Sequence, residues 1–358
     1  MARLGDYVRI RTGKLDANAS SEDGQYPFFT CAVEPLRIDS YSYDCECVLV
    51  AGNGDLNVKY YNGKFDAYQR TYIIESLDKT MLSVPYLYCF LDKYVEKLRE
   101  LSIGGVIKYI KLGNLTEAEI PLPALKEQES IVELCDKANA LIALRKQQIA
   151  KLDELVKARF VEMFGDIIET VPLSYYIAAL IAGKSLAGEE FCPNKVLKTG
   201  AASYDYFDPS QVKDLPVDYE PQEEHRVNTG DVIISRMNTA ELVGAAAYVW
   251  EAPGCTYLPD RLWRAEIKDT ACPIFVWQIL IQRSTKESIR CIASGTSGSM
   301  KNISKPGLLG IRVKKVPLDL QKQFSTFVAQ TDQQKLTIQH SLAKLELLKK
   351  ALMQKYFG

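Results

Sequence analysis

Residues 149–165, with the sequence IAKLDELVKARFVEMFG, recur 193 residues further along as LAKLELLKKALMQKYFG at residues 342–358. The two segments share 8 of 17 residues, including the closing Phe-Gly pair. Upstream of each lies a Pro-Leu segment followed by a glutamine, so that Gln128 is matched with Gln323. Residues 105–110 likewise resemble residues 298–303. A period this long indicates duplication of a whole domain with its helix, and not a solenoid of short repeats.

Each copy is predicted to end in a long helix. Residues 126–164 contain no proline or glycine and are rich in Ala, Leu, Glu, Lys and Gln, which favour helix. About 38 helical residues would span roughly 57 Å. Apolar residues recur at the 3.5-residue spacing typical of coiled coils. The predicted coiled-coil residues are Leu134, Leu141, Ile142, Ile149, Leu152 and Val156, with Ile338, Leu342, Leu345, Leu348 and Leu352.

We expect these two helices to pack against each other as an antiparallel coiled coil, because they are equally long and separated by a compact domain. The alternative, in which each helix packs on its own globular neighbour, stays open at this point. The length favours the coiled coil, since globular helices average about 11–12 residues.

The region that precedes each long helix has the pattern of a mixed α/β (α+β) domain with short strands. Strands are expected at residues 47–51 and 71–74, followed by a helix at residues 84–101. In the second copy, strands are expected at residues 230–234, 245–249 and 261–267, and a helix at residues 274–281. The predicted organisation is a first domain at 1–122, a central helix at 123–165, a second domain at 166–318 and a last helix at 319–358.

Composition excludes several classes of protein. The 358 residues carry 44 basic and 45 acidic side chains, so bulk charge does not favour polyanion binding. The nine cysteines have no regular spacing, which argues against a disulfide framework or a zinc site and favours reduced thiols. No apolar run reaches the roughly 20 residues of a membrane helix, and the first residues do not resemble a signal segment. We therefore expect a cytoplasmic protein.

No catalytic constellation is recognisable in the sequence. There is no Walker phosphate loop, no G-x-G-x-x-G fingerprint and no Asn-Pro-Pro-Tyr-like segment of the kind adenine methyltransferases use. Histidine occurs twice, at His225 and His340, which leaves little material for metal or triad chemistry. We expect neither catalytic residues nor a metal or cofactor in this chain. A duplicated protein without a reaction centre is expected to hold or recognise a partner.

Polar and aromatic residues in the predicted loops have the chemistry of a DNA-recognition surface. Amides and arginines can recognise base edges, and lysines can position phosphates. In the first copy the candidates are Asn53, Lys59, Tyr61, Asn62, Lys64, Gln69, Arg70 and Lys108. In the second they are Arg236, Asn238, Arg261, Arg264, Ser297, Lys301 and Asn302. Lys59, Lys64, Lys108 and Lys301 are expected to contact phosphates, and Arg70, Arg236, Asn238 and Arg261 to contact bases.

The order of these features resembles the specificity subunit of type I restriction–modification enzymes. The resemblance rests on short motifs in each copy and on both helices with their Phe-Gly ends. In the first copy these motifs are Tyr26-Pro27-Phe28-Phe29-Thr30, residues 48–54 and Gly63-Lys64-Phe65. In the second they are residues 230–233 and the loop from Gly298 to Lys301-Asn302-Ile303.

The resemblance implies two target-recognition domains, each recognising one half of a split double-stranded DNA sequence, with the helix pair fixing the gap. It also implies a non-catalytic subunit that assembles with two methyltransferase and two restriction subunits. S-adenosylmethionine, ATP and Mg would be bound by those partners. Two alternatives remain: a coiled-coil scaffold without DNA sequence preference, and the specificity subunit of a fused restriction–methylation enzyme.

Overall fold

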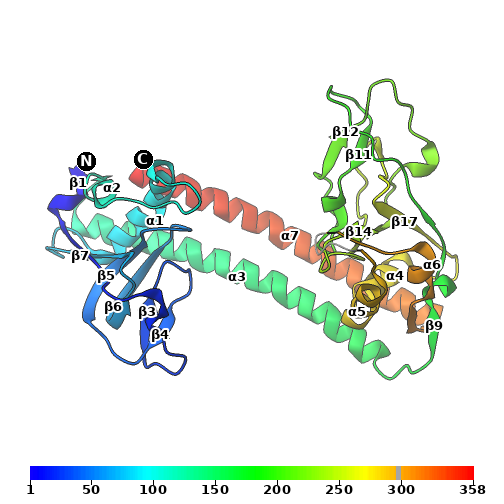
Figure 1. Ribbon diagram of the computed structural model, residues 1–358, viewed down its shortest axis with the longest axis horizontal. Helices are drawn as coiled ribbons and strands as arrows, with labels where there is room; N and C mark the ends of the chain where they lie inside the picture. The colour runs from blue at the N-terminus through cyan, green and yellow to red at the C-terminus, as the bar shows by residue number, and fades with distance from the viewer. Residues whose placement is uncertain (296–299) are drawn as a thin grey trace. The chain divides into compact units, whose positions relative to one another are not determined.

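The computed structural model describes residues 1–295 and 300–358, and it divides into two compact units. Unit 1 comprises Met1–Gln148 and Ile338–Gly358, and unit 2 comprises Ile149–Thr337. Two helices of 40 residues each, α3 (Leu125–Phe164) and α7 (Leu318–Phe357), contribute a segment to each unit (Figure 1). The helix bounds lie within two residues of those predicted. Ser297, a predicted site residue, lies outside the described residues.

Unit 1 is built on one strongly curled six-stranded sheet in the order β2-β7-β5-β6-β3-β4. Its strands are β2 (Val8–Thr12), β3 (Tyr26–Phe29), β4 (Leu36–Ile38), β5 (Tyr43–Ala51), β6 (Val58–Ala67) and β7 (Thr71–Ser76). A parallel bridge between Leu15 and Tyr68 joins the segment that follows the edge strand β2 to the segment that follows β6. A pair of short strands, β1 (Ala2–Arg3) and β8 (Glu119–Ile120), lies beside it.

The helix predicted at residues 84–101 is α1 (Val84–Leu101) of unit 1. Ser83 caps its N-terminus by accepting a hydrogen bond from the backbone N–H of Tyr86, and Pro85 lies in its first turn. Its buried face includes Leu87, Phe90 and Leu91, which belong to the same core as Val48 and Ile74 of the sheet. A short helix, α2 (Leu112–Thr116), precedes β8.

Unit 2 contains a four-stranded sheet in the order β10-β17-β13-β15 and a three-stranded sheet in the order β12-β11-β16. The bounds are β10 (Ile177–Ile181), β11 (Lys195–Leu197), β12 (Val212–Asp214), β13 (Val232–Ser235), β15 (Ala246–Tyr248), β16 (Thr256–Tyr257) and β17 (Leu262–Ile267). Two strand pairs complete the unit: β9 (Thr170–Pro172) with β19 (Arg312–Lys314), and β14 (Met237–Asn238) with β18 (Lys301–Asn302). Its helices are α4 (Pro273–Leu280), α5 (Arg283–Ile292) and α6 (Lys305–Gly310).

The two units share a strand order, which confirms the internal repeat. The antiparallel neighbours β2-β7-β5-β6 of unit 1 correspond to β10-β17-β13-β15 of unit 2. A strand pair in each unit also corresponds. In unit 1, β3 is antiparallel to β4 and parallel to β6. In unit 2, β11 is antiparallel to β12 and parallel to β16. The mixed α+β fold class predicted from the sequence is therefore confirmed.

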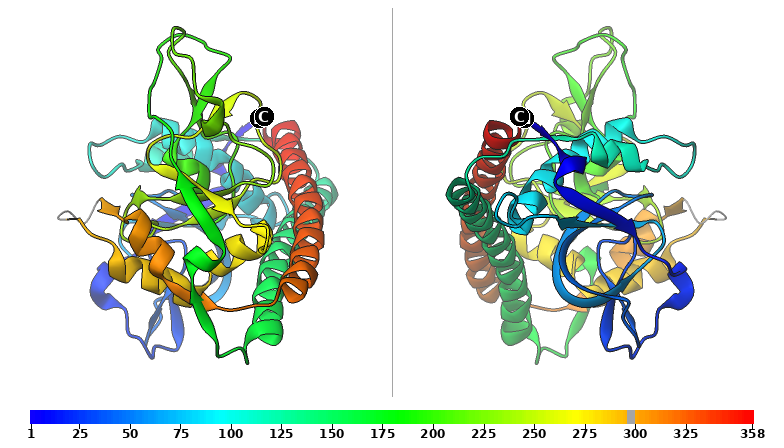
Figure 2. Two further views of the ribbon diagram at one scale, coloured as in Figure 1. Left: turned by 90° about the vertical axis from the view of Figure 1, so that its right-hand side faces the viewer. Right: turned by 90° about the vertical axis from the view of Figure 1, so that its left-hand side faces the viewer.

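In each unit the segments of α3 and α7 lie side by side and run in opposite directions (Figure 2). In unit 1, Cys135 lies 3.7 Å from Met353 (Sγ–Sδ), and Lys146 pairs with Glu346 at 3.5 Å. In unit 2, Asp153 accepts a hydrogen bond from Lys335 at 2.7 Å. Further along α3 in that unit, the aromatic rings of Phe160 and Phe324 are 5.6 Å apart. The alternative of two unpaired helices is thus excluded within each unit.

A heptad seam carries this packing. Along α3 the inward residues are Gln128, Ile131, Cys135, Ala138, Ile142, Arg145, Ile149, Leu152, Val156 and Arg159, and their equivalents 193 residues later form the seam of α7. Three leucines predicted for the coiled coil lie outside this seam: Leu134, Leu141 and Leu348 are 41%, 44% and 53% exposed. They belong to a flanking column of the heptad that faces away from the neighbouring helix.

The starts of the two long helices show that the predicted match of Gln128 with Gln323 is wrong. Gln128 is buried in unit 1, and the residue in the equivalent place of unit 2 is Gln321, which is also buried. Gln323, which the sequence comparison matched with Gln128, is exposed. The shift between the helix starts is therefore the same 193 residues as between the helix ends.

Candidate nucleic-acid interface

In unit 1, backbone hydrogen bonds bring three predicted site residues together at the loops that follow the sheet strands. The Gly52 N–H donates to the carbonyl of Arg70 at 2.8 Å, and the Gly54 N–H donates to the carbonyl of Lys108 at 2.9 Å. Asn53, between these glycines, forms a bridge with Tyr109. A side chain at position 52 would place its Cβ 2.3 Å from the Arg70 oxygen, so glycine is required for this close approach.

Two further candidates lie beside this loop cluster and have intramolecular partners. Lys59 donates to the Asn57 side-chain oxygen, and Asn57 in turn donates to the carbonyl of Cys31 at 2.8 Å. Burial lowers the pKa of Lys59. Gln69 donates to the carboxylate of Asp16 at 2.8 Å. These bonds fix the side chains before any ligand binds.

Lys59, Tyr61, Asn62 and Lys64 lie on strand β6, although the sequence placed them in a loop. Gly63 pairs with Cys45 inside the sheet and takes its positive φ of 136° there. The side chain of Lys64 lies over the ring of Tyr41 at 4.7 Å. The assignment of these four residues to a loop is therefore wrong, because they lie within the sheet.

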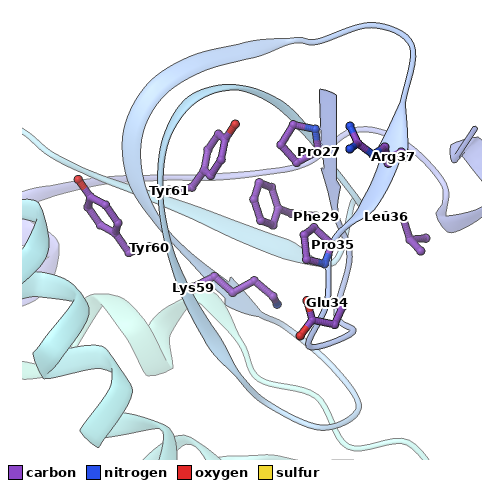
Figure 3. Close-up of a pocket in the computed structure, with 9 residues that line it drawn as sticks. All are labelled: Pro27, Phe29, Glu34, Pro35, Leu36, Arg37, Lys59, Tyr60 and Tyr61. Atoms are coloured by element: carbon purple, nitrogen blue, oxygen red, sulfur yellow. The ribbon is translucent and has the colours of Figure 1, made fainter. Parts of the chain in front are cut away.

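A hollow of about 590 Å³ opens next to β6 (Figure 3). Tyr60 and Tyr61 of β6 lie on one side of it, and residues of the β3–β4 hairpin lie on the other. The lining residues are Pro27, Phe29, Glu34, Pro35, Leu36, Arg37, Lys59, Tyr60 and Tyr61. It combines aromatic faces with a few charged groups, as surfaces that contact nucleic acids do.

In unit 2 the strand pair β14–β18 gathers five predicted residues. Asn238 is paired with Lys301 and Met237 with Asn302 in its register. The Arg236 guanidinium donates to the Asn302 side-chain oxygen at 3.2 Å and lies over the ring of Trp263 at 5.7 Å. The Arg236 N–H donates to the carbonyl of Arg261 at 3.0 Å. We name this set of Arg236, Asn238, Arg261, Lys301 and Asn302 the unit 2 cluster.

Arg264, also predicted for the interface, has a different environment. Its guanidinium donates to the carbonyls of Arg226 at 2.7 Å and Glu224 at 2.9 Å, and it lies 3.9 Å from the carboxylate of Asp231. Its side chain is 14% exposed. These bonds hold the segment before β13 against β17, so the Arg264 guanidinium is already bonded within the domain.

The sequence analysis missed two exposed tyrosines beside the unit 2 cluster. Asn238 donates to the Ser203 hydroxyl at 3.1 Å, and Tyr204 and Tyr206 follow directly in the chain. They are 66% and 54% exposed. The sequence signal was the Tyr204-Asp205-Tyr206 triplet, which does not by itself indicate a site because the sequence does not show that Asn238 lies beside it.

Two negative observations apply to the part of the chain that the structure describes. No helix there is long and apolar enough to cross a membrane. No group of three or more His, Cys, Asp or Glu side chains there is arranged to hold a metal ion.

One family model and two curated proteins match this chain. Residues 1–154 match the family model described as Type I restriction modification DNA specificity domain. Over 154 residues the chain is 41% identical to the Type I restriction enzyme EcoDI specificity subunit of Escherichia coli, covering 43% of this chain and 34% of that protein. It is 22% identical over 289 residues to the EcoKI specificity subunit of E. coli strain K12, covering 74% and 62%. The chain thus spans one third to three fifths of these relatives.

Solved structures match over the whole chain. The S subunit of a type I restriction–modification system from M. genitalium aligns with a TM-score of 0.66 and 18% identity, covering 100% of this chain and 95% of that one. A chain from a structure of type I R-M complex assembly and conformational transition aligns with a TM-score of 0.53 and 16% identity, covering 99% and 96%.

The fold of the chain is therefore the one found in the S subunits of type I restriction–modification systems. Residues 1–154 are similar to the type I restriction-modification DNA specificity domain. The resemblance stated from the sequence is confirmed.

Proposed function

We propose that this chain is the non-catalytic specificity subunit of a type I restriction–modification enzyme. In this proposal each unit recognises one half of a bipartite DNA target. The observation that carries the proposal is the repeated strand order with a polar loop cluster in each copy: Asn53, Arg70 and Lys108 in unit 1 and the unit 2 cluster in the other. Two copies of one fold with different side chains suit two different half-sites.

The long helices have the role of a spacer in this proposal. A continuous helix has a fixed rise of about 1.5 Å per residue, so two paired helices set a distance that does not depend on the DNA. Half-sites recognised by two similar domains on one face of a duplex lie about one helical turn, roughly 34–36 Å, apart. The base pairs between the half-sites would then be unrecognised, and their number would depend on helix length.

The partners in the proposal are double-stranded DNA, two methyltransferase subunits and two restriction subunits. The methyltransferase subunits would use S-adenosylmethionine, and the restriction subunits ATP and Mg. The chain's net charge of −1 is consistent with partners that supply many of the phosphate contacts. Exposed leucines on the long helices, Leu134 and Leu141 in unit 1 and Leu155 and Leu336 in unit 2, offer apolar contacts to such partners.

The test compares one arginine from each unit. Arg236→Ala and Arg70→Ala are assembled separately with type I methyltransferase subunits, and each complex selects duplexes from a random-sequence library. Each substitution is expected to relax a different half of the selected sequence and to cost roughly 1–3 kcal/mol of discrimination. Arg236→Lys is the matched variant, since it keeps the charge but loses the planar guanidinium. A wild-type complex that selects no sequence would refute the proposal and leave the scaffold interpretation.

A further inference from the structure

The loop between β11 and β12 of unit 2 exposes two neighbouring aromatic rings to solvent. Tyr204 and Tyr206 are 66% and 54% exposed, their ring centroids are 6.4 Å apart, and their planes differ by 20°. Tyrosine is a frequent contact residue because it presents a large apolar face and a polar hydroxyl at low entropic cost. Two near-parallel rings so close together form one contact surface.

The residue between the tyrosines holds this surface in place. Asp205 has a φ of 63°, in the left-handed region that few residues other than glycine adopt. Its carboxylate accepts a hydrogen bond from the Ala246 N–H of β15 at 3.2 Å and forms an ion pair with Lys286 of α5. The Asp205 side chain therefore faces the domain, while the rings on either side of it remain in solvent. Strained backbone that is anchored in this way is a recurrent feature of functional sites.

The tyrosine pair adjoins the unit 2 cluster. The Ser203 hydroxyl accepts a hydrogen bond from the side-chain amide of Asn238 at 3.1 Å, and Tyr204 is the next residue. Asn238 is paired with Lys301 in the β14–β18 register. A ligand that contacts Asn238 and Lys301 thus has the exposed rings at its border.

The same hairpin in unit 1 adjoins that unit's candidate residues. The β3–β4 loop, residues 30–35, corresponds by strand order to the β11–β12 loop, residues 198–211. In unit 1 the Cys31 thiol of this loop contacts the carbonyl of Arg70 at 3.6 Å. The loop is short there and has no aromatic residue, whereas in unit 2 it is longer and carries both tyrosines. The equivalent loops therefore occupy equivalent places with different chemistry.

We propose that Tyr204 and Tyr206 contact the DNA and help determine the half-site sequence recognised by unit 2, with Asp205 as their positioning residue. This inference rests on the proposed function. The ring faces would pack on thymine methyl groups and deoxyribose, and the hydroxyls would donate to base or phosphate oxygens. A surface for a partner protein is the competing role, and the adjacent Asn238 and Lys301 favour DNA.

The test uses the chain assembled with type I methyltransferase subunits and a random-sequence duplex library. For Tyr204→Ala/Tyr206→Ala, we expect relaxed base preference in one half of the selected sequence only, and about tenfold weaker binding of the best duplex. The other half-site and the gap should not change. Phe191→Ala is the control, because it removes a ring that is 81% exposed elsewhere in unit 2.

Asp205→Gly tests the positioning role separately. Glycine keeps the left-handed backbone but removes the carboxylate that bonds to Ala246 and Lys286. We expect it to relax the same half-site while both rings are still present. A fall in affinity without any change in base preference would overturn the specificity role.

Three further outcomes are distinguishable. A double variant that selects the wild-type sequence with wild-type affinity would overturn the inference and leave the proposed function intact. A double variant that no longer assembles with the methyltransferase subunits would identify a protein-contact surface, and the DNA role would be rejected. A wild-type complex without any sequence preference would reject the proposed function and this inference with it.

Discussion

Gln128 and Gln321, 193 residues apart, make equivalent hydrogen bonds at the starts of the two long helices. The Gln128 oxygen accepts from the Ser83 N–H at 3.0 Å, and its nitrogen donates to the Pro123 carbonyl at 3.0 Å. The Gln321 oxygen accepts from the Cys272 N–H at 3.0 Å, and its nitrogen donates to the Val316 carbonyl at 2.8 Å. Ser83 and Cys272 are the residues that precede α1 and α4. Each glutamine thus fixes a long helix to the first turn of its domain's own helix.

Replacement of this glutamine should destabilise the unit that contains it. In Gln128→Leu the Ser83 N–H and the carbonyls of Met81 and Pro123 lose their partner in a partly buried environment. Each unsatisfied group costs about 1–3 kcal/mol, so we expect a loss of about 2–4 kcal/mol in the free energy of unfolding. Urea denaturation followed by circular dichroism measures this loss.

The control for that experiment is Gln323→Leu, because Gln323 is exposed and was the residue matched to Gln128 by sequence. Exposed substitutions usually change stability by less than about 0.5 kcal/mol. Equal losses for the two variants would contradict the structural alignment.

Shortening both long helices should change the gap in the DNA target. Deleting one heptad from each, residues 142–148 and 335–341, keeps the seam in register and removes about 10 Å of helix. We expect the number of base pairs between the half-sites to change while the half-site sequences are kept. Lys146→Ala/Glu346→Ala, which removes an exposed ion pair between the helices without shortening them, should keep the gap. An unchanged gap after the deletion would refute the spacer role.

Loss of a phosphate contact should weaken binding to all sequences alike. Lys108 is exposed, and its backbone is fixed to Gly54 next to Asn53. In Lys108→Ala we expect the slope of log affinity against log salt to fall by about 1, with the base preferences retained. Lys126→Ala removes the same charge from an exposed position on α3. The assignment of Lys108 fails if both variants show the same salt slope.

Asp332, a half-buried residue of α7 next to the seam residue Thr331, should make the stability of the chain depend on pH. Burial raises the pKa of Asp332 above its usual value, with the nearby Asp153 carboxylate contributing in the same direction and Lys335 opposing it. A carboxyl with a raised pKa in the folded state is destabilising when it is charged, at pH values above its unfolded pKa of about 4. Asp332→Asn should therefore stabilise the chain at pH 7, and the gain should vanish as the pH falls below about 4.

Thermal unfolding at pH 7 and at pH 3.5 measures this difference. Asp136→Asn, on the exposed side of α3, serves as the control. A stabilisation by Asp332→Asn that is equal at both pH values would contradict the role assigned to burial.

The sequence predicted the elements whose local and tertiary signals agree. Helix α1 was predicted with the observed bounds, because Ser83 and Pro85 mark its start and its apolar residues follow the helical period. The long helices were predicted because a heptad pattern over 40 residues admits no other regular structure. The leucines outside the seam were misplaced because apolar residues on a flanking column have the same period as those inside it.

The candidate site was less predictable, because it depends on contacts between distant segments. The meeting of Asn53 with Tyr109, and of Arg236 with Asn302, requires pairings between distant segments that local patterns do not encode. The residues of β6 were assigned to a loop because the segment is rich in Asn, Tyr, Lys and Gly, and its pairing with β5 shows that it is a strand. The sequence around Arg264 does not distinguish it from Arg261 as a candidate. The structure does, because the Arg264 guanidinium donates to the carbonyls of Glu224 and Arg226.

We propose that the two units recognise separate halves of one DNA target. Mapping methylated adenines genome-wide, in cells that carry the chain with type I methyltransferase subunits, tests this proposal. We expect two short defined sequences separated by a gap of constant length and variable sequence. Methylation at a single uninterrupted sequence, or at sites without a common sequence, would contradict it.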